Sequence, residues 1–94
     1  TIANPQHDAR AISMLTGTQI RAARALIGWS ARDLAGHSAV SWHTVQRAEA
    51  ARGNTPNIQA LKLASIQKAL ESAGVIFLPD GLNGGPGVRL KAPG

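Results

Sequence analysis

Cysteine is absent from the 94 residues, and aromatic and acidic side chains are few. Without cysteine the chain can form neither a disulfide framework nor a thiolate metal site. Three histidines and five acidic residues are too scattered to predict a metal site of another kind. No apolar run approaches the roughly 18 residues that a membrane-spanning helix requires. The first 13 residues also lack the apolar core of a secretory signal, so we expect a soluble, cytoplasmic protein.

Basic residues outnumber acidic ones along most of the chain. Ten Lys and Arg stand against five Asp and Glu, a formal charge of +5 with neutral histidines. Between Thr16 and Asn54 the arginines are opposed only by Asp33 and Glu49, so the excess is not confined to the tail. Such a balance favours a polyanionic partner, with nucleic acid first and an acidic membrane surface second.

The composition changes sharply near residue 74. Small aliphatic residues dominate before it and favour a helical core, whereas six of the ten glycines and three of the five prolines lie from Gly74 onward. We therefore predict a flexible N-terminal arm or remnant over 1–15, a helical domain over 16–74 and a tail over 75–94. A short extra helix near residues 9–15 is the alternative for the arm.

Capping signals predict four helices within the helical domain. Thr16 and Gln19 have the capping-box spacing, and Gly28 ends the first helix. Ser30 begins a second helix that ends near Gly36 or His37.

The third and fourth helices are predicted in the same way. Ser41 caps the third, which ends at Arg52–Asn54. Thr55 caps the fourth, with Pro56 as its first residue, and this helix runs to about Ala73.

The tail reads as a β-hairpin. Val75–Leu78 is a short β-type run, a glycine-rich turn follows, and Gly87–Lys91 alternates apolar and basic residues. Because an isolated hairpin is marginal in water, it must pack on the fourth helix or pair with another chain.

Residues 30–50 carry the pattern with the clearest functional meaning. Two short helices joined by a turn of three to four residues are typical of a helix-turn-helix motif, whose second helix enters the DNA major groove. Small apolar residues supply the inner face, and polar or cationic ones the outer face. The inner set is Ala35, Val40, Val45 and Ala48; the outer set is Trp42, His43, Gln46 and Arg47.

This segment resembles the Cro and phage-repressor class of helix-turn-helix regulators. The resemblance runs from Thr16 to Gly74 and rests on Ile20–Arg24, Ser30-x-x-x-Leu34-Ala35 and Val40-Ser41-x-x-Thr44-Val45-x-Arg47-x-Glu49. It implies an all-α, lambda-repressor-like bundle of four to five helices, here followed by a C-terminal β-hairpin. It also implies a sequence-specific transcriptional regulator that binds a palindromic operator as a homodimer, usually as a repressor.

The resemblance further implies roles for individual residues. Arg24 and Glu49 match a structural ion pair between the first and third helices. The candidates for base contacts are Trp42, His43, Gln46 and Arg47. The candidates for phosphate contacts are Ser30, Arg32, Ser41, Thr44, Arg52 and Asn54.

Three positions depart from the pattern of that class. Ala31 stands where glutamine is frequent, and Ala39 where glycine is usual, which costs roughly 1 kcal/mol if the position is left-handed. Trp42 stands where a polar residue is expected. Its indole donates one hydrogen bond, so it would contact a thymine methyl or the sugar backbone, or else pack against a neighbouring loop or chain.

Two candidate base contacts also have simpler interpretations. His43 is either a base contact or a solvated surface residue. Arg47 either meets guanine O6 and N7 with its planar fork or contacts a phosphate.

A homodimer is expected because one reader helix covers only half of a palindromic site. We expect the tail to supply the contact, through Val75, Ile76, Phe77, Leu78, Val88 and Leu90. The same apolar tail favours the alternative function, an antitoxin or antiactivator-type module that holds a second protein. A nonspecific nucleoid protein is a further alternative. No catalytic triad or phosphate-loop spacing is present, so we expect neither an enzyme nor a cofactor.

Overall fold

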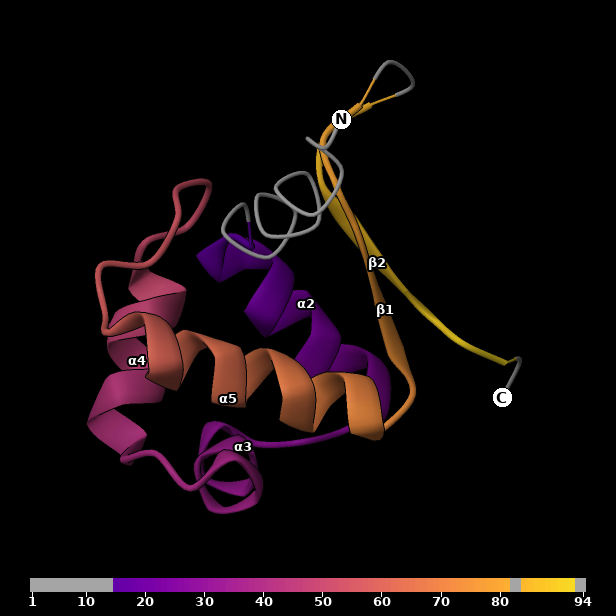
Figure 1. Ribbon diagram of the computed structural model, residues 1–94. Coiled ribbons are helices and arrows are strands. Elements are labelled where there is room, and N and C mark those ends of the chain that lie inside the picture. Colours follow the sequence, from indigo (N-terminus) through magenta and orange to yellow (C-terminus); the bar gives the residue numbers. More distant parts are fainter. Residues whose placement is uncertain (1–14, 82–83, 93–94) are drawn as a thin grey trace, which may run out of the picture.

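The computed structural model describes residues 15–81 and 84–92 (Figure 1). In this part, four helices precede an antiparallel hairpin, which confirms the expected fold class. The elements are α2 (Gly17–Ile27), α3 (Ala31–Ser38), α4 (Trp42–Ala50), α5 (Ala60–Ser72), β1 (Val75–Leu78) and β2 (Gly87–Leu90). The predicted N-terminal arm lies outside the described residues except for Leu15. Within the described residues, no helix is both long and apolar enough to cross a membrane.

The first three helices begin at the predicted N-caps. The side chains of Thr16, Ser30 and Ser41 each accept a hydrogen bond from the backbone N–H three residues later. In return, the backbone N–H of Thr16 donates to the side-chain Oε1 of Gln19 at 2.9 Å, which completes the capping box. Asp33 does the same for Ser30, and the hydrogen bond from the Ser30 N–H holds the pKa of the Asp33 carboxyl below its ordinary value.

The prediction for the start of the fourth helix was wrong. Thr55 and Pro56 precede a non-helical segment, and α5 begins only at Ala60, after Gln59, whose side chain makes no capping hydrogen bond. Pro56 is buried and Ile58 packs against the core. Because this non-helical segment buries Pro56 and half-buries Ile58, tertiary packing outweighs the local capping signal.

The core draws its large side chains from all four helices. The largest fully buried residues come from α2, α3, α4 and α5 and meet in one cluster; they are Ile20, Leu34, Val45, Ile66 and Leu70. Small residues at Ala23 and Ala48 are equally buried, which lets α2 and α4 approach closely. One continuous apolar cluster therefore positions every helix relative to the others.

The hairpin packs on the helices of its own chain, along α2 and α5 and on the opposite side of the bundle from α4 (Figure 1). Val75 pairs with Leu90 in register, and Val75 is only 3% exposed. The buried Gln19 side chain donates hydrogen bonds to the carbonyl oxygens of Leu78 and Gly87 at 3.1 and 3.0 Å. The expected contact with the last helix is thus confirmed, and α2 provides a second one.

Gly17 marks the closest approach between α2 and the end of α4. A Cβ atom at this position would lie 2.5 Å from the carbonyl oxygen of Ala48 and 2.8 Å from the nitrogen of Arg52. Beside it, the Thr18 N–H donates to the carbonyl of Arg52 at 2.9 Å. The backbones therefore meet without an intervening side chain, which only glycine permits.

The substitution Gly17→Ala tests this approach. We expect it to lower the free energy of unfolding by about 1–3 kcal/mol, because backbone atoms must move apart to admit the methyl group. The matched control is Gly36→Ala, in the interior of α3 with open space around it. The control should raise stability by up to about 1 kcal/mol, since alanine favours the helix. Urea denaturation followed by circular dichroism measures both, and a stabilising Gly17→Ala would contradict the packing.

Candidate nucleic-acid interface

The connection between α3 and α4 is a tight turn of three residues, Ala39 to Ser41. Ala39 has φ 59° and ψ 34°, the left-handed conformation that the sequence analysis considered for this position. Its N–H and that of Val40 both donate to the carbonyl of Ala35, which closes the end of α3. The two helices and their turn form the predicted helix-turn-helix arrangement.

The two faces of α4 differ as expected. Thr44, Val45 and Ala48 are buried, whereas His43, Gln46 and Arg47 are exposed. The buried residues share one stripe at helical spacing, and the exposed ones share the opposite stripe. The four predicted base-contact residues therefore lie on the outer side of α4, although Trp42 is half-buried.

The predicted phosphate contacts divide into exposed and buried residues. Those exposed to solvent are Ser30, Arg32, Ser41, Arg52 and Asn54. Thr44 is 8% exposed, and its hydroxyl lies 2.9 Å from that of Ser41. This burial gives no support to a phosphate contact by Thr44, and we leave it out of the candidate interface.

Arg52 occupies a constrained turn at the end of α4. Its φ is 52°, and Ala39 is the other described residue besides glycine with a positive φ. The Arg52 N–H donates to the carbonyl of Glu49 at 3.1 Å, and the Asn54 N–H donates to that of Ala51 at 2.9 Å. These bonds fix the backbone while both side chains remain in solvent.

The predicted ion pair between Arg24 and Glu49 is present and links α2 to α4. The Arg24 Nε and Nη2 atoms donate to the two carboxylate oxygens, the second at 2.8 Å, and Nη1 donates to the carbonyl of Trp29 at 3.0 Å. The side chains are 18% and 13% exposed. The hydrogen bond to Glu49 raises the pKa of the Arg24 guanidinium, although burial opposes the shift. This bidentate contact joins α2, the connection before α3, and α4.

Trp42 contacts a residue that the sequence analysis did not connect with it. The Cζ atom of Arg32 lies 4.4 Å from the centroid of the Trp42 ring, within the range of a cation–π contact. The His43 ring lies 5.1 Å from that of Trp42 at an interplanar angle of 57°. No short-range spacing rule links Arg32 to Trp42, because the contact crosses from α3 to α4.

A second aromatic contact lies between α3 and the residues before it. Trp29 is partly buried against the core, and its ring also stacks on His37, with centroids 4.1 Å apart and planes within 5°. No role for His37 was expected from the sequence. The stack ties the end of α3 to the connection that precedes the same helix.

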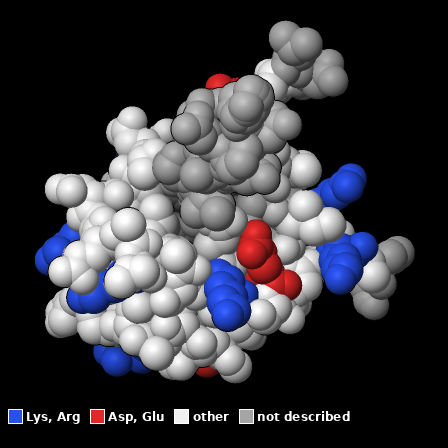
Figure 2. Space-filling model, viewed as in Figure 1, with Lys and Arg blue, Asp and Glu red and all other residues white. Residues whose placement is uncertain are grey.

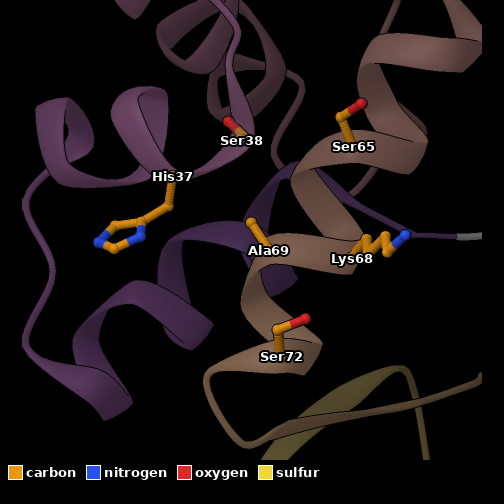
Figure 3. A pocket seen from close by; sticks show the side chains of 6 residues that line it. All are labelled: His37, Ser38, Ser65, Lys68, Ala69 and Ser72. Carbon is orange, nitrogen blue, oxygen red and sulfur yellow. The ribbon is translucent and has the colours of Figure 1, made fainter.

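A hollow of about 290 Å³ lies between α3 and α5. It is lined by His37, Ser38, Ser65, Lys68, Ala69 and Ser72. In Figure 3 the side chains of His37 and Lys68 extend away from each other, so its polar groups do not converge on one point. Among the described residues, no group of three His, Asp or Glu side chains could hold a metal ion. This hollow therefore lacks the arrangement of a catalytic or metal site.

Basic side chains do not form one large patch on the face in Figure 2. They are spread from the side where α4 lies to the end of β2, with an acidic group near the middle of the view. The candidate interface is thus defined by the outer side of α4 and the adjoining helix ends. Its basic members are Arg32, Arg47 and Arg52, and the exposed Asp33 lies beside Arg32 in the first turn of α3.

Comparison with models of protein families and with curated protein sequences finds no match to this chain.

The left-handed Ala39 provides a direct test of the turn geometry. We expect Ala39→Gly to raise the free energy of unfolding by about 1 kcal/mol, because glycine adopts this conformation without a Cβ clash. The control Ala25→Gly, at an exposed position inside α2, should lower it by about the same amount. Thermal unfolding of both variants measures the difference, and destabilisation by Ala39→Gly would mean that the turn has another conformation.

Proposed function

We propose that this chain is a sequence-specific double-stranded DNA-binding transcriptional regulator that inserts α4 into the major groove. The observation that carries the proposal is the division of α4 into two faces. His43, Gln46 and Arg47 are exposed, while Val45 and Ala48 are completely buried behind them. A helix held from behind with hydrogen-bonding side chains outward has the form that major-groove reading requires.

The chemistry of the outer face suits base edges. Arg47 presents a planar fork that matches O6 and N7 of guanine, and Gln46 can pair with N6 and N7 of adenine. His43 can donate to or accept from a base edge. The only acidic residue of α4, Glu49, is paired with Arg24 and so does not repel the DNA backbone.

The helix ends suit the phosphate backbone. Ser30 and Ser41 cap the starts of α3 and α4, where the helix dipole favours an anion. Arg32, Arg52 and Asn54 lie exposed near these ends or just beyond α4. Contacts of this kind position the protein on the duplex, while the residues of α4 choose the sequence.

Binding-site selection from a random duplex library, followed by fluorescence anisotropy, tests the proposal. We expect the selected duplex to bind more tightly than a scrambled one. We also expect the affinity for both duplexes to decrease as the salt concentration is raised from about 50 to about 200 mM, because phosphate contacts release counterions. Binding that ignores both sequence and salt would contradict the proposal. Salt-dependent binding without preference would instead support a nonspecific nucleoid protein.

Substitutions at Arg47 and Arg52 separate reading from positioning. Arg47→Ala should lose about 1–3 kcal/mol of discrimination at one base pair and relax the preference there. Arg52→Ala should weaken binding about equally on every sequence, because a phosphate contact carries no sequence information. Anisotropy on the selected duplex and its single-base variants measures both effects. If Arg52→Ala relaxed the base preference and Arg47→Ala weakened binding uniformly, the roles of the two residues would be misassigned.

A homodimer is part of the proposal, since two-fold symmetry would place two copies of α4 about 34 Å apart on successive major grooves. Val75, Phe77 and Val88 pack against the core of their own chain, which removes them from a dimer contact. Leu90 pairs with Val75 and therefore shares its inward face, whereas Ile76 and Leu78 lie on the other face and are at least partly exposed. The proposed contact between protomers is therefore narrowed to Ile76 and Leu78.

Light scattering of the full chain tests the hairpin contact. The full chain is used because a truncation after Gly74 would remove the core residue Val75. Leu78→Glu, at a side chain 36% exposed, should turn a dimer into a monomer by placing a charge in the contact. The control is Leu61→Glu on α5, where the side chain is 82% exposed. A monomeric unchanged protein would contradict the dimer, and dissociation by Leu61→Glu alone would place the contact on α5.

A second candidate function is a module that binds another protein, such as the antitoxin of a toxin pair. Leu61 and Leu26 favour it, because these large apolar side chains are 82% and 41% exposed outside the candidate DNA interface. Purification from the native host distinguishes the two functions. A stoichiometric second protein, lost on Leu61→Glu, would support this candidate.

A further inference from the structure

The contact between Arg32 and Trp42 joins the beginnings of the two helices in the helix-turn-helix arrangement. Arg32 is the second residue of α3, and Trp42 is the first residue of α4. The Arg32 Cζ atom lies 4.4 Å from the ring centroid, so the guanidinium rests over the indole. His43 lies against the same indole at 5.1 Å. The ring is thus bordered by two side chains, one from each helix.

The guanidinium of Arg32 keeps its hydrogen-bonding capacity in this position. No carboxylate among the described residues forms an ion pair with Arg32, and the neighbouring Asp33 accepts the N–H of Ser30. A guanidinium in a cation–π contact uses its face, whereas its N–H donors lie in its plane. Those donors therefore remain available for an anion in front of α3.

We propose that Arg32 and Trp42 act as one phosphate-binding unit, in which Trp42 is a positioning residue and Arg32 makes the contact. The inference rests on the proposed DNA-binding function. In a helix-turn-helix protein the first helix of the motif crosses the DNA backbone while the second enters the groove. Arg32 stands on that first helix, and its planar fork matches two phosphate oxygens.

This arrangement gives Trp42 a role other than base reading. Stacking limits the rotamers of the long arginine side chain before DNA arrives, so less conformational entropy is lost on binding. With Arg32 over its ring, Trp42 contributes to affinity through the position of the guanidinium. The polar residue usual at this position in similar motifs would not provide that platform.

A double-mutant cycle measures the coupling between the two residues. Arg32→Ala should weaken binding roughly 3- to 10-fold on every duplex and make the slope of log affinity against log salt shallower by about 1. Trp42→Leu should weaken binding in the same uniform way, and Trp42→Phe should restore part of the loss because phenylalanine keeps a ring. In the Arg32→Ala background, Trp42→Leu should have almost no further effect.

The control for charge alone is Arg89→Ala, on β2 at the side of the bundle opposite α4 (Figure 1). Trp42→Leu should keep its full effect in the Arg89→Ala background. Circular dichroism and thermal unfolding confirm that each variant is folded before its affinity is compared.

Each outcome decides the proposal. Coupling between Arg32 and Trp42 with unchanged base preference supports it. Independent, additive losses overturn it, as does a change in base preference caused by Trp42→Leu, which would make Trp42 a base reader. If the unchanged protein binds no duplex at any salt concentration, the proposed function fails and the phosphate-binding unit fails with it.

Discussion

The ion pair between Arg24 and Glu49 is the contact on which the orientation of α4 depends. It is bidentate and mostly buried, and Arg24 also holds the carbonyl of Trp29, so one side chain joins α2, the connection before α3, and α4. Removing either partner would leave an uncompensated charge in a confined site. At the same C-terminal end of α4, Gly17 lets the start of α2 meet the backbone of Ala48 and Arg52. These two contacts present the outer face of α4 to solvent.

The fold places the proposed DNA-binding surface and the proposed association surface on different sides of the molecule. α4 lies on one side of the bundle, and the hairpin lies on the other, packed along α2 and α5 (Figure 1). Gln19 belongs to both parts, because it completes the Thr16 cap and also donates to two carbonyls of the hairpin. The proposed reader helix and the proposed association surface therefore lie on opposite sides of a single core.

Local signals predicted much of this molecule, and long-range contacts account for what they missed. The caps at Thr16, Ser30 and Ser41 follow from side chains within three residues, whereas the Arg24–Glu49 pair was expected only from the resemblance to the Cro and phage-repressor class. The start of α5 was misplaced because the burial of Pro56 and Ile58 outweighs the capping signal. The close approach at Gly17, the Arg32–Trp42 contact and the Trp29–His37 stack depend on how the helices pack.

The central claim is that the outer side of α4 is the surface that meets DNA. A titration of the nitrogen-15-labelled full chain with its selected duplex, followed by amide chemical shifts, tests it most directly. We expect the largest changes on residues 42–47 of α4 and at the start of α3, with the hairpin nearly unchanged. Changes confined to the hairpin and α5, with α4 unaffected, would contradict it.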